Sequence, residues 1–345
     1  MNQYKLTEYS HGAGCGCKIS PKILSKIIGD KNSKVNFSTL LVGNDTRDDA
    51  AVIDLGNGTA IVSTTDFFMP IVDDAEDFGK ISAANAISDI YAMGATPIMA
   101  IAILGWTLDK LPPELAGLVI KGGESICHEA NIPLAGGHSI DSPEPIFGLS
   151  VTGKINKNNI KKNSDAKDGD LIYLTKPLGV GIFTTAVKKG KIKNGDIEIA
   201  KSSMLKLNKI GAVLGKHSFV HAMTDVTGFG FLGHLNEICN ASNLSAVIDF
   251  ESVPLLDKKA MDYYLLNKCI PGGTKRNWES YASDIASISE YQKHILCDPQ
   301  TSGGLLITVD KKHKEEFENI VHEQNLKLKP LGEITRKEEK NIIIK

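Results

Sequence analysis

Apolar residues in the first half of the chain follow a mixture of strand and helix periods. Residues 50–66 hold two apolar runs around Gly-Asn-Gly, a pattern that predicts a β-hairpin. Residues 78–95 have helical spacing, and Gly94 and Pro97 end that helix. The following runs predict a strand at 97–104, a helix at 112–130, a strand at 132–137 that runs into a loop, and a strand at 145–155.

The pattern changes at residues 156–170, which contain a single large apolar residue, Ile160. We interpret this stretch as a domain junction, although a solvated loop within one domain has the same composition. Beyond it we expect a strand at 171–175, a long polar helix at 196–215, a strand–loop–helix unit at 218–242, strands at 245–250 and 303–309, a helix at 313–324 and two short final strands. The predicted organisation is a mixed α/β protein with a flexible glycine-rich loop (1–20), a first domain (21–156) and a second domain (157–345).

Composition narrows the classes of function. The chain has 345 residues, a formal net charge of −2 and 42% hydrophobic residues, which gives no general electrostatic reason to bind nucleic acid or an acidic membrane. The start, MNQYKLTEYS, has no apolar signal-peptide core, and the most apolar window, 97–106, is too short to span a bilayer. We therefore expect a cytoplasmic protein whose six cysteines are not disulfide-bonded.

One predicted helix carries an isolated carboxylate. Asp89 is the only charged residue between Ile81 and Met93, and Ser82, Asn85 and Asp89 form a polar stripe along this otherwise apolar helix. A buried carboxylate needs a cationic partner or a metal ion. A metal site and a buried salt bridge or capping network both satisfy that need.

Further aspartates occur where strands meet turns. Asp66 ends an alternating run, Asp48 and Asp49 flank Arg47 before a strand, and Asp225 precedes a glycine-rich turn that opens a helix. Capping and exposed-turn roles are the structural alternatives. Aspartate oxygens suit Mg²⁺, and glycine turns at a helix start or after a strand, as at 136–139, suit phosphate. Because the chain lacks a Walker sequence, the pattern indicates a nucleotide–Mg²⁺ site outside the P-loop class.

A rival interpretation rests on glycine spacing. Gly228, Gly230 and Gly233 match the dinucleotide fingerprint G-x-G-x-x-G, with Asp249 about twenty residues further on. Polar residues intervene between the strand and the first glycine, and the fingerprint gives the other aspartates no role.

The segment HGAGCGCK (11–18) places two thiols and a lysine on a glycine-rich stretch. Lys18 is close enough in sequence to lower the pKa of a neighbouring thiol. We interpret the segment as a mobile loop that closes over a site. An inert tail and a zinc-binding or redox module through Cys15 and Cys17 are the alternatives.

Eight segments together resemble the selenophosphate synthetase (selenide, water dikinase) family in its bacterial cysteine-containing form. They are HGAGCGCK, LLVGNDTRDDAAV, STTDFFMPIVDD, NAISDIYAMGATPIMAIAILGW, LAGGHSID, AMTDVTGFGFLGH, PGGTKRN and CDPQTSGGLL. The resemblance covers essentially the whole chain. The wider aminoimidazole ribonucleotide synthetase superfamily shares the aspartates but not HGAGCGCK.

The resemblance implies a two-domain fold of that superfamily, with the N-terminal domain pairing in a homodimer. It implies a reaction in which ATP, hydrogen selenide and water give selenophosphate, phosphate and AMP. A selenium-delivery protein is a possible partner, and no nucleic acid or membrane is expected. A related synthase or kinase acting on a carbon substrate is the alternative.

The resemblance also assigns roles to residues. The catalytic residues would be Cys15 and Lys18, and Asp49, Asp89 and Asp225 would bind Mg²⁺. ATP contacts would be Lys18, Thr46, Arg47, Asp48, Asp66, Asp89, Gly137, His138 and Ser139.

Overall fold

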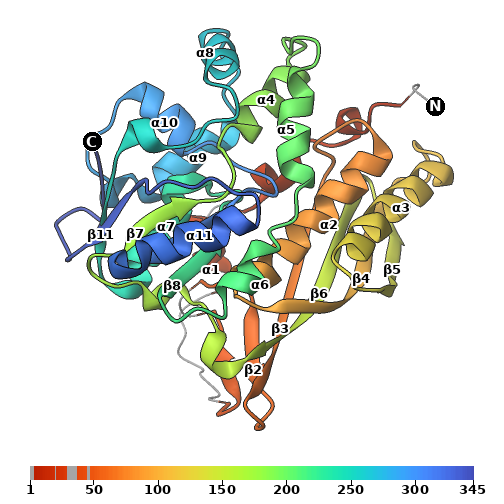
Figure 1. Ribbon diagram of the computed structural model, residues 1–345. Helices are drawn as coiled ribbons and strands as arrows, with labels where there is room; N and C mark the ends of the chain where they lie inside the picture. The colour runs from red at the N-terminus through yellow and green to blue at the C-terminus, as the bar shows by residue number, and fades with distance from the viewer. Residues whose placement is uncertain (1–3, 20, 29–36, 45–46) are drawn as a thin grey trace.

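The hairpin predicted at 50–66 is the start of a six-stranded sheet. The computed structural model describes residues 4–19, 21–28, 37–44 and 47–345 (Figure 1). Its first sheet has the order β1-β2-β3-β6-β4-β5, antiparallel except for the parallel pair β4–β5. The strands are β1 (Leu40–Val42), β2 (Ala51–Asp54), β3 (Thr59–Phe68), β4 (Thr96–Trp106), β5 (Leu134–Asp141) and β6 (Ile146–Asn156).

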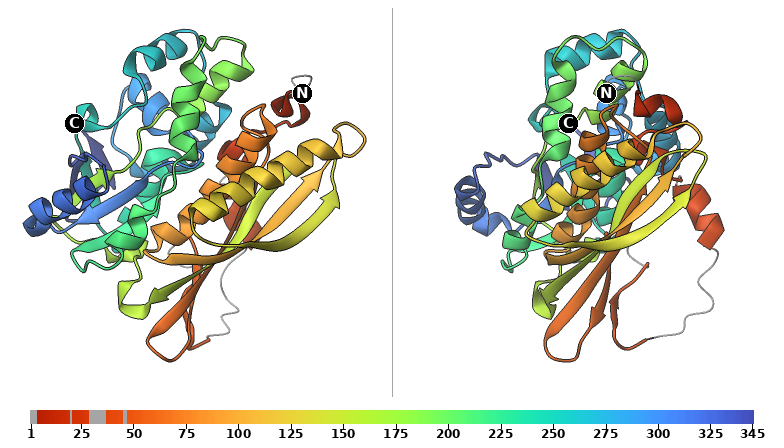
Figure 2. Two further views of the ribbon diagram at one scale, coloured as in Figure 1. Left: turned by 45° about the vertical axis from the view of Figure 1, so that its right-hand side comes forward. Right: turned by 90° about the vertical axis from the view of Figure 1, so that its right-hand side faces the viewer.

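Helices α2 (Ala75–Ala92) and α3 (Pro113–Glu129) pack together and lie over one face of this sheet (Figure 2). The side chain of Asp74 caps α2 by accepting a hydrogen bond from the backbone N–H of Asp77, so the helix begins before the predicted Phe78. Glycines let the two helices approach closely: a Cβ on Gly79 would lie 1.9 Å from the carbonyl oxygen of Val119. As a result α2 is buried around most of its circumference, as its sequence indicates.

The C-terminal part of the chain, from β7 onward, forms a second six-stranded sheet in the order β12-β9-β11-β7-β10-β8. Only β12–β9 is parallel in this sheet. Its strands are β7 (Leu171–Leu174), β8 (Val220–Asp225), β9 (Ser245–Ile248), β10 (Leu305–Val309), β11 (Gly332–Thr335) and β12 (Ile342–Ile344). The remaining helices are α1 (Pro21–Ile28), α4 (Val180–Lys188), α5 (Asp196–Leu205), α6 (Ile210–Leu214), α7 (Gly230–Ser242), α8 (Lys258–Leu266), α9 (Gly272–Tyr281), α10 (Glu290–Leu296) and α11 (Lys314–Glu323).

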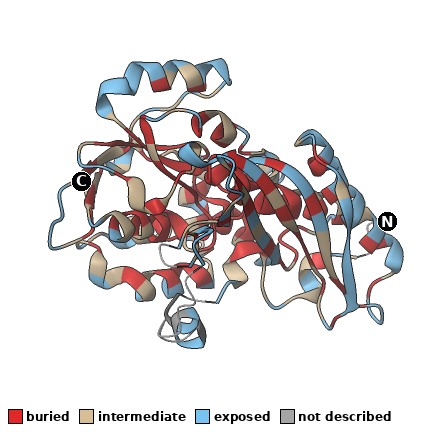
Figure 3. Ribbon diagram, turned by 90° about the horizontal axis from the view of Figure 1, so that it is seen from below, coloured by how far each residue is buried: buried red, intermediate tan, exposed pale blue. Residues whose placement is uncertain are grey.

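Helix α2 joins the two parts, because its outer side contacts α5, α6 and β8. The main apolar core is therefore continuous from the first sheet into the second part. Figure 3 shows buried residues gathered in the middle of the molecule, with exposed residues on outlying helices and strands. The polar stretch 156–170 connects the two sheets, and it contains the buried residues Lys161 and Asn163.

Two expectations about secondary structure are wrong. The helix predicted at 196–215 is interrupted between α5 and α6, where the buried Asn208 donates hydrogen bonds to Ser88 Oγ and to the carbonyl of Gly303. These tertiary bonds need a non-helical turn, which local propensity does not predict. The strand predicted to end in a loop near Gly137 continues to Asp141, because β5 pairs with β4 along its length.

Within the part of the chain that the structure describes, no helix combines the length and apolar character needed to cross a bilayer.

Candidate active site

Three of the predicted aspartates converge between the two sheets. Asp49 lies just before β2, Asp89 on α2 and Asp225 at the end of β8, and their ligand oxygens lie within 4.8 Å of one another. Among the described residues, this is the only group of three His, Cys, Asp or Glu side chains so arranged. Elements more than a hundred residues apart thus form one carboxylate cluster.

Two threonines orient this cluster. Thr64 donates its hydroxyl to Asp89 Oδ2 at 2.5 Å, and Thr224 donates to Asp49 Oδ1 at 2.9 Å. Each threonine lies on a strand, β3 or β8, so the sheets fix the carboxylate directions. Oδ2 of Asp49 and Oδ2 of Asp225 are buried without a hydrogen-bond partner.

The environment disfavours three negative charges. Burial raises the pKa of Asp49, Asp89 and Asp225, and repulsion from Asp225 raises the pKa of the other two further. Orphaned oxygens in a close trio of carboxylates are the donor set that a hard divalent cation takes. The residues therefore fit Mg²⁺, as the sequence predicts.

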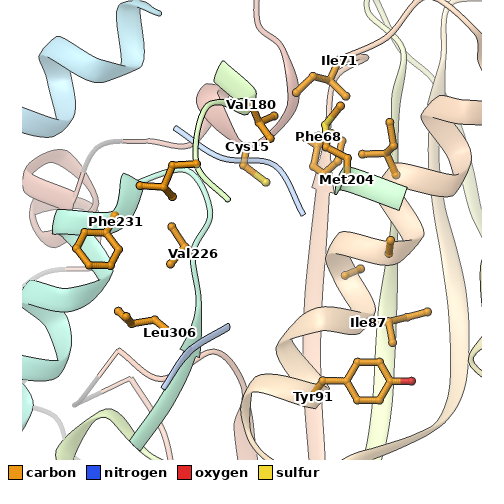
Figure 4. Close-up of a cluster of buried hydrophobic side chains, with 14 of the residues drawn as sticks. Cys15, Phe68, Ile71, Ile87, Tyr91, Val180, Met204, Val226, Phe231 and Leu306 are labelled. Atoms are coloured by element: carbon orange, nitrogen blue, oxygen red, sulfur yellow. The ribbon is translucent and has the colours of Figure 1, made fainter. Parts of the chain in front are cut away.

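The N-terminal segment is packed against this region rather than extended away from it. Short 3-10 helices at Leu6–Tyr9 and Gly14–Cys17 bury Leu6 and Cys15 completely. Figure 4 shows Cys15 just below Val180, with Val226 to its lower left and Phe68 and Ile71 to its right. The loop is closed over the space between the two parts, as expected for a segment that covers a site.

Cys15 and Lys18 reach the same polar network from this loop. The Cys15 thiol donates to Asn85 Oδ1 at 3.2 Å, and Lys18 Nζ lies 3.2 Å from Asp66 Oδ2. Asn85 closes the network by donating its amide to the same Asp66 oxygen at 2.5 Å. The structure thus brings the predicted thiol and cation together with Asp66, which lies within β3, beside the aspartate cluster.

Lys18 lowers the pKa of the Cys15 thiol, as expected, but a larger effect opposes it in this closed arrangement. Burial raises the pKa of Cys15 well above its ordinary value, and the opposing effect of Lys18 is smaller. Burial also opposes the charge on Lys18, but Asp66, Cys15, Asp89 and Asp225 outweigh it and raise the pKa of this ammonium. Lys18 is therefore charged and Cys15 is a neutral thiol that donates a hydrogen bond.

The residues around Arg47 lie next to the cluster. The half-buried Asp48 accepts a hydrogen bond from the backbone N–H of Asn163 at 2.7 Å, and exposed Arg47 lies 3.8 Å from Glu237. The exposed-turn alternative is wrong for Asp48, which ties this turn to the segment between the sheets. Thr46 lies outside the described residues.

Gly137, His138 and Ser139 lie apart from the aspartates. They occupy the exposed edge strand β5. Asp66, Leu149, Ala102 and Gly137 form one row across the sheet, so Gly137 lies three strands, or about 14 Å, from Asp66. Within one chain, two strands therefore separate Gly137 from Asp66, and the predicted nucleotide contacts of Gly137, His138 and Ser139 stay predictions.

Several polar residues that sequence reasoning gave no role complete the network. Thr301 accepts from the backbone N–H of Cys15, and the N–H of Ser302 donates to Asn85 Oδ1 at 2.7 Å. Buried Lys176 donates to the carbonyl of Ser302 at 2.8 Å, and burial lowers the pKa of this lysine to about 7. The polar stripe of α2 and the TSGG run were the available signals, but neither identifies partners that are distant in sequence.

The dinucleotide interpretation is wrong, whereas the zinc alternative for Cys15 and Cys17 stays untested. Strands β8 and β9, which flank the glycine match, are separated by β10, β7 and β11 and therefore form no parallel βαβ pair. Asp249 caps a short turn by accepting from the N–H of Glu251. Cys17 donates its thiol to the carbonyl of Gly14 at 2.9 Å, and all six cysteines are free.

Family models match both parts of the chain. The model described as AIR synthase related protein, N-terminal domain, matches residues 47–155, and the corresponding C-terminal domain model matches residues 167–345. The fold and the matches define an AIR synthase related protein that contains both domains.

Relatives that match nearly the whole chain indicate which family of AIR synthase related proteins it belongs to. A selenide, water dikinase from Aeromonas salmonicida is 56% identical over 334 residues, which cover 97% of this chain and 96% of the relative. The chain therefore belongs to the selenide, water dikinase family, and the resemblance noted from its motifs is confirmed.

Solved structures agree on the fold. A thiamine-monophosphate kinase from Stenotrophomonas maltophilia superposes with a TM-score of 0.64 at 20% identity, covering 90% of this chain and 92% of that chain. A structure described as AaThiL complexed with AMPPCP and TMP gives a TM-score of 0.66 at 16% identity, covering 94% and 91%. The predicted mixed α/β fold of the aminoimidazole ribonucleotide synthetase type is confirmed.

Proposed function

We propose that this chain synthesises selenophosphate from ATP, hydrogen selenide and water, with release of AMP and phosphate. The observation that carries the proposal is the closed N-terminal loop, which puts Cys15 and Lys18 into one network with Asp66 beside three clustered carboxylates. Family membership supports the same reaction.

The carboxylate cluster supplies the metal-binding part of the site. Asp49, Asp89 and Asp225 would hold Mg²⁺, which neutralises the charge of a polyphosphate and stabilises a phosphoryl group in transfer. Thr64 and Thr224 fix the direction of two of these carboxylates and so reduce reorganisation during the reaction.

Lys18 and Asp66 supply the part that faces the nucleotide. In the closed loop Lys18 Nζ pairs with Asp66, so its three N–H donors lie where a phosphate oxygen can replace or join that carboxylate. Arg47 and Asp48 directly precede Asp49 in the chain and are further proposed nucleotide contacts. Asn85 holds Asp66 and Cys15 in fixed relative positions.

Cys15 supplies a neutral, fully buried thiol. We assign it the role of positioning selenide as the selenium atom attacks the γ-phosphorus and ADP leaves. Water then cleaves the β-phosphate of ADP. Closure of the loop over Cys15 excludes bulk water from the first transfer, which protects selenide and the phosphorylated product.

The test is anaerobic phosphorus NMR of the purified protein with ATP and Mg²⁺, with and without selenide. We expect a selenide-dependent phosphorus–selenium resonance, with AMP as the final nucleotide. ATP turnover to ADP that ignores selenide would refute the proposal and favour the alternative, a related synthase or kinase with a carbon substrate.

We also propose a homodimer through the uncovered face of the first sheet. The register puts Phe67, Ile101 and Ile140 on the face opposite α2, and their exposed fractions are 49%, 42% and 58%. Apolar patches of this kind mark interfaces. Ile101→Arg should convert a dimer to a monomer in sedimentation analysis; a wild-type monomer would refute the pairing. A selenium-delivery partner and a cytoplasmic location stay predictions.

A further inference from the structure

Two cavities adjoin the closed loop on the side of the C-terminal part, and the mechanism above uses neither. The smaller one has a volume of about 10 Å³ and is lined by Cys15, Lys18, Phe229 and Arg276, among others. The larger is a cleft of about 250 Å³ between the loop, α4 and the start of α9. Arg276, Gly16 and Gly273 line both, so the two cavities adjoin each other.

We propose that the cleft is the access route of the hydrogen selenide anion and that the small cavity holds its selenium atom before transfer. The inference rests on the proposed function and adds a binding place for the second substrate.

The volume of the small cavity favours a single selenium atom as its occupant. A cavity of about 10 Å³ admits roughly one water-sized sphere. A selenium atom is somewhat larger than a water molecule, so a small widening of the cavity admits it, whereas a phosphate with four oxygens or any part of a nucleotide exceeds the cavity by far more. The occupant would lie between Cys15 and Lys18, the two residues already assigned to the selenium step.

The charged side chains that line the cleft favour an anion as the molecule that passes through it. Lys188 and Arg276 line the cleft on opposite helices, α4 and α9, and they are exposed at its walls. Burial lowers the pKa of Lys188, while Cys17, Asp73 and Glu144 oppose that effect. Glu144 lies 2.8 Å from Nδ1 of His11, which lines the cleft, so this nearby carboxylate already has a partner at the cleft wall.

Both cations also hold the loop. Lys188 donates to the carbonyl of Gly12 at 2.9 Å and Arg276 donates to the carbonyl of Gly16 at 3.0 Å. Each bond uses one donor of a multi-donor group, which leaves other N–H groups for an anion. The alternative is that Lys188 and Arg276 only hold the loop closed, as a latch, and do not bind substrate. The experiment must distinguish this latch role from substrate binding.

The first variant is Arg276→Met, with Lys275→Met as its matched control. Lys275 directly precedes Arg276 on α9. Its side chain is 83% exposed and forms a surface ion pair with Glu279. Anaerobic steady-state kinetics give kcat and the KM for selenide, and calorimetry gives the affinity for Mg·ATP.

For Arg276→Met we expect a KM for selenide at least about fivefold higher, kcat within about threefold and unchanged Mg·ATP affinity, because a substrate-binding charge is lost. Lys275→Met should match wild type. A fall in kcat at constant KM would make Arg276 a latch only and overturn its substrate role.

The second variant leaves the latch bonds intact. Thr185 is half-buried on α4 and lines the cleft, so Thr185→Glu adds a carboxylate to the route and Thr185→Gln is its neutral match. We expect Thr185→Glu to raise the KM for selenide about threefold or more over Thr185→Gln at low salt, and salt to reduce the difference. Equal KM values would place the route elsewhere.

These outcomes differ from failure of the proposed function. A wild-type protein that forms no selenide-dependent product would overturn the function and the route together, before any variant is compared.

Discussion

Gly228 offers a direct test of loop closure. It lies at the turn after β8, and a Cβ built on it would lie 2.4 Å from the carbonyl oxygen of Cys15. Its φ lies outside the left-handed region, so Gly228→Ala adds steric bulk without backbone strain. The substitution therefore opposes the closed loop and little else.

The magnitude follows from that distance. Non-bonded heavy atoms rest about 3.5 Å apart, so the Cys15 backbone must retreat by about 1 Å. A misplacement of about 1 Å in a reacting group lowers a rate by about 100-fold, or about 2.7 kcal/mol in the activation free energy. We expect Gly228→Ala to lower kcat for selenide-dependent AMP formation by about this factor, with Mg·ATP affinity within about threefold.

Two readouts accompany the kinetics. Alkylation of Cys15 by iodoacetamide, followed by mass spectrometry, should be faster in Gly228→Ala, because closure buries this thiol completely. The fully buried Cys127 serves as the internal standard. Gly117→Ala, which meets no atom within 4 Å, controls for the added methyl group. Wild-type kcat together with unchanged protection of Cys15 would refute the reasoning.

Two further predictions concern the same network, and a third concerns the buried carboxylate of Asp298. Cys15→Ser should abolish the selenide-dependent product in phosphorus NMR while nucleotide binding persists. Cys17→Ser, which loses only a contact to Gly14, should keep most activity. Full synthesis by Cys15→Ser would refute the role assigned to Cys15. Asp225→Asn should weaken Mg²⁺ binding in calorimetry by about tenfold or more, because it removes one charged ligand from a hard-cation site. It should not lower the melting temperature in EDTA, since it also removes a repelling charge. Unchanged Mg²⁺ affinity would mean that Asp225 has a structural role only. Burial raises the pKa of Asp298 to about 8, so the folded state holds a proton that the unfolded state releases, and this residue makes stability fall as pH rises from about 4 to about 8. A pKa difference of about four units between the folded and unfolded states sets an upper limit of about 5 kcal/mol on that loss of unfolding free energy. Asp298→Asn should reduce the difference in unfolding free energy between pH 5 and pH 8, measured by denaturant titration. An equal difference in the wild type and the variant would contradict the assignment.

Much of the fold could be predicted from the sequence because its elements depend on local pattern. The β2–β3 hairpin follows from two apolar runs around Gly56 and Gly58, both of which have positive φ. Helix α2 follows from its spacing, and the isolation of Asp89 on it correctly indicates a buried carboxylate.

The remainder depends on contacts between distant segments. The break between α5 and α6 exists because Asn208 bonds to Ser88 and Gly303, which local propensity does not encode. The pKa of Cys15 depends mainly on burial by both parts of the chain, which outweighs the lowering effect of its sequence neighbour Lys18. Ser302 has a φ of 48°, and its N–H reaches Asn85 across more than two hundred residues.

Electrostatics explains why a glycine-rich segment packs into this interior. Asp49, Asp66, Asp89 and Asp225 lie together, and Lys18 brings a positive charge to them when the loop closes. Closure and cation binding therefore act on the same negative charge. Because coupling free energies are reciprocal, a cation bound to the cluster weakens the attraction for Lys18 by as much as Lys18 weakens the cation. A polyphosphate adds negative charge, so we expect nucleotide and metal together to reverse that balance and to favour the closed loop.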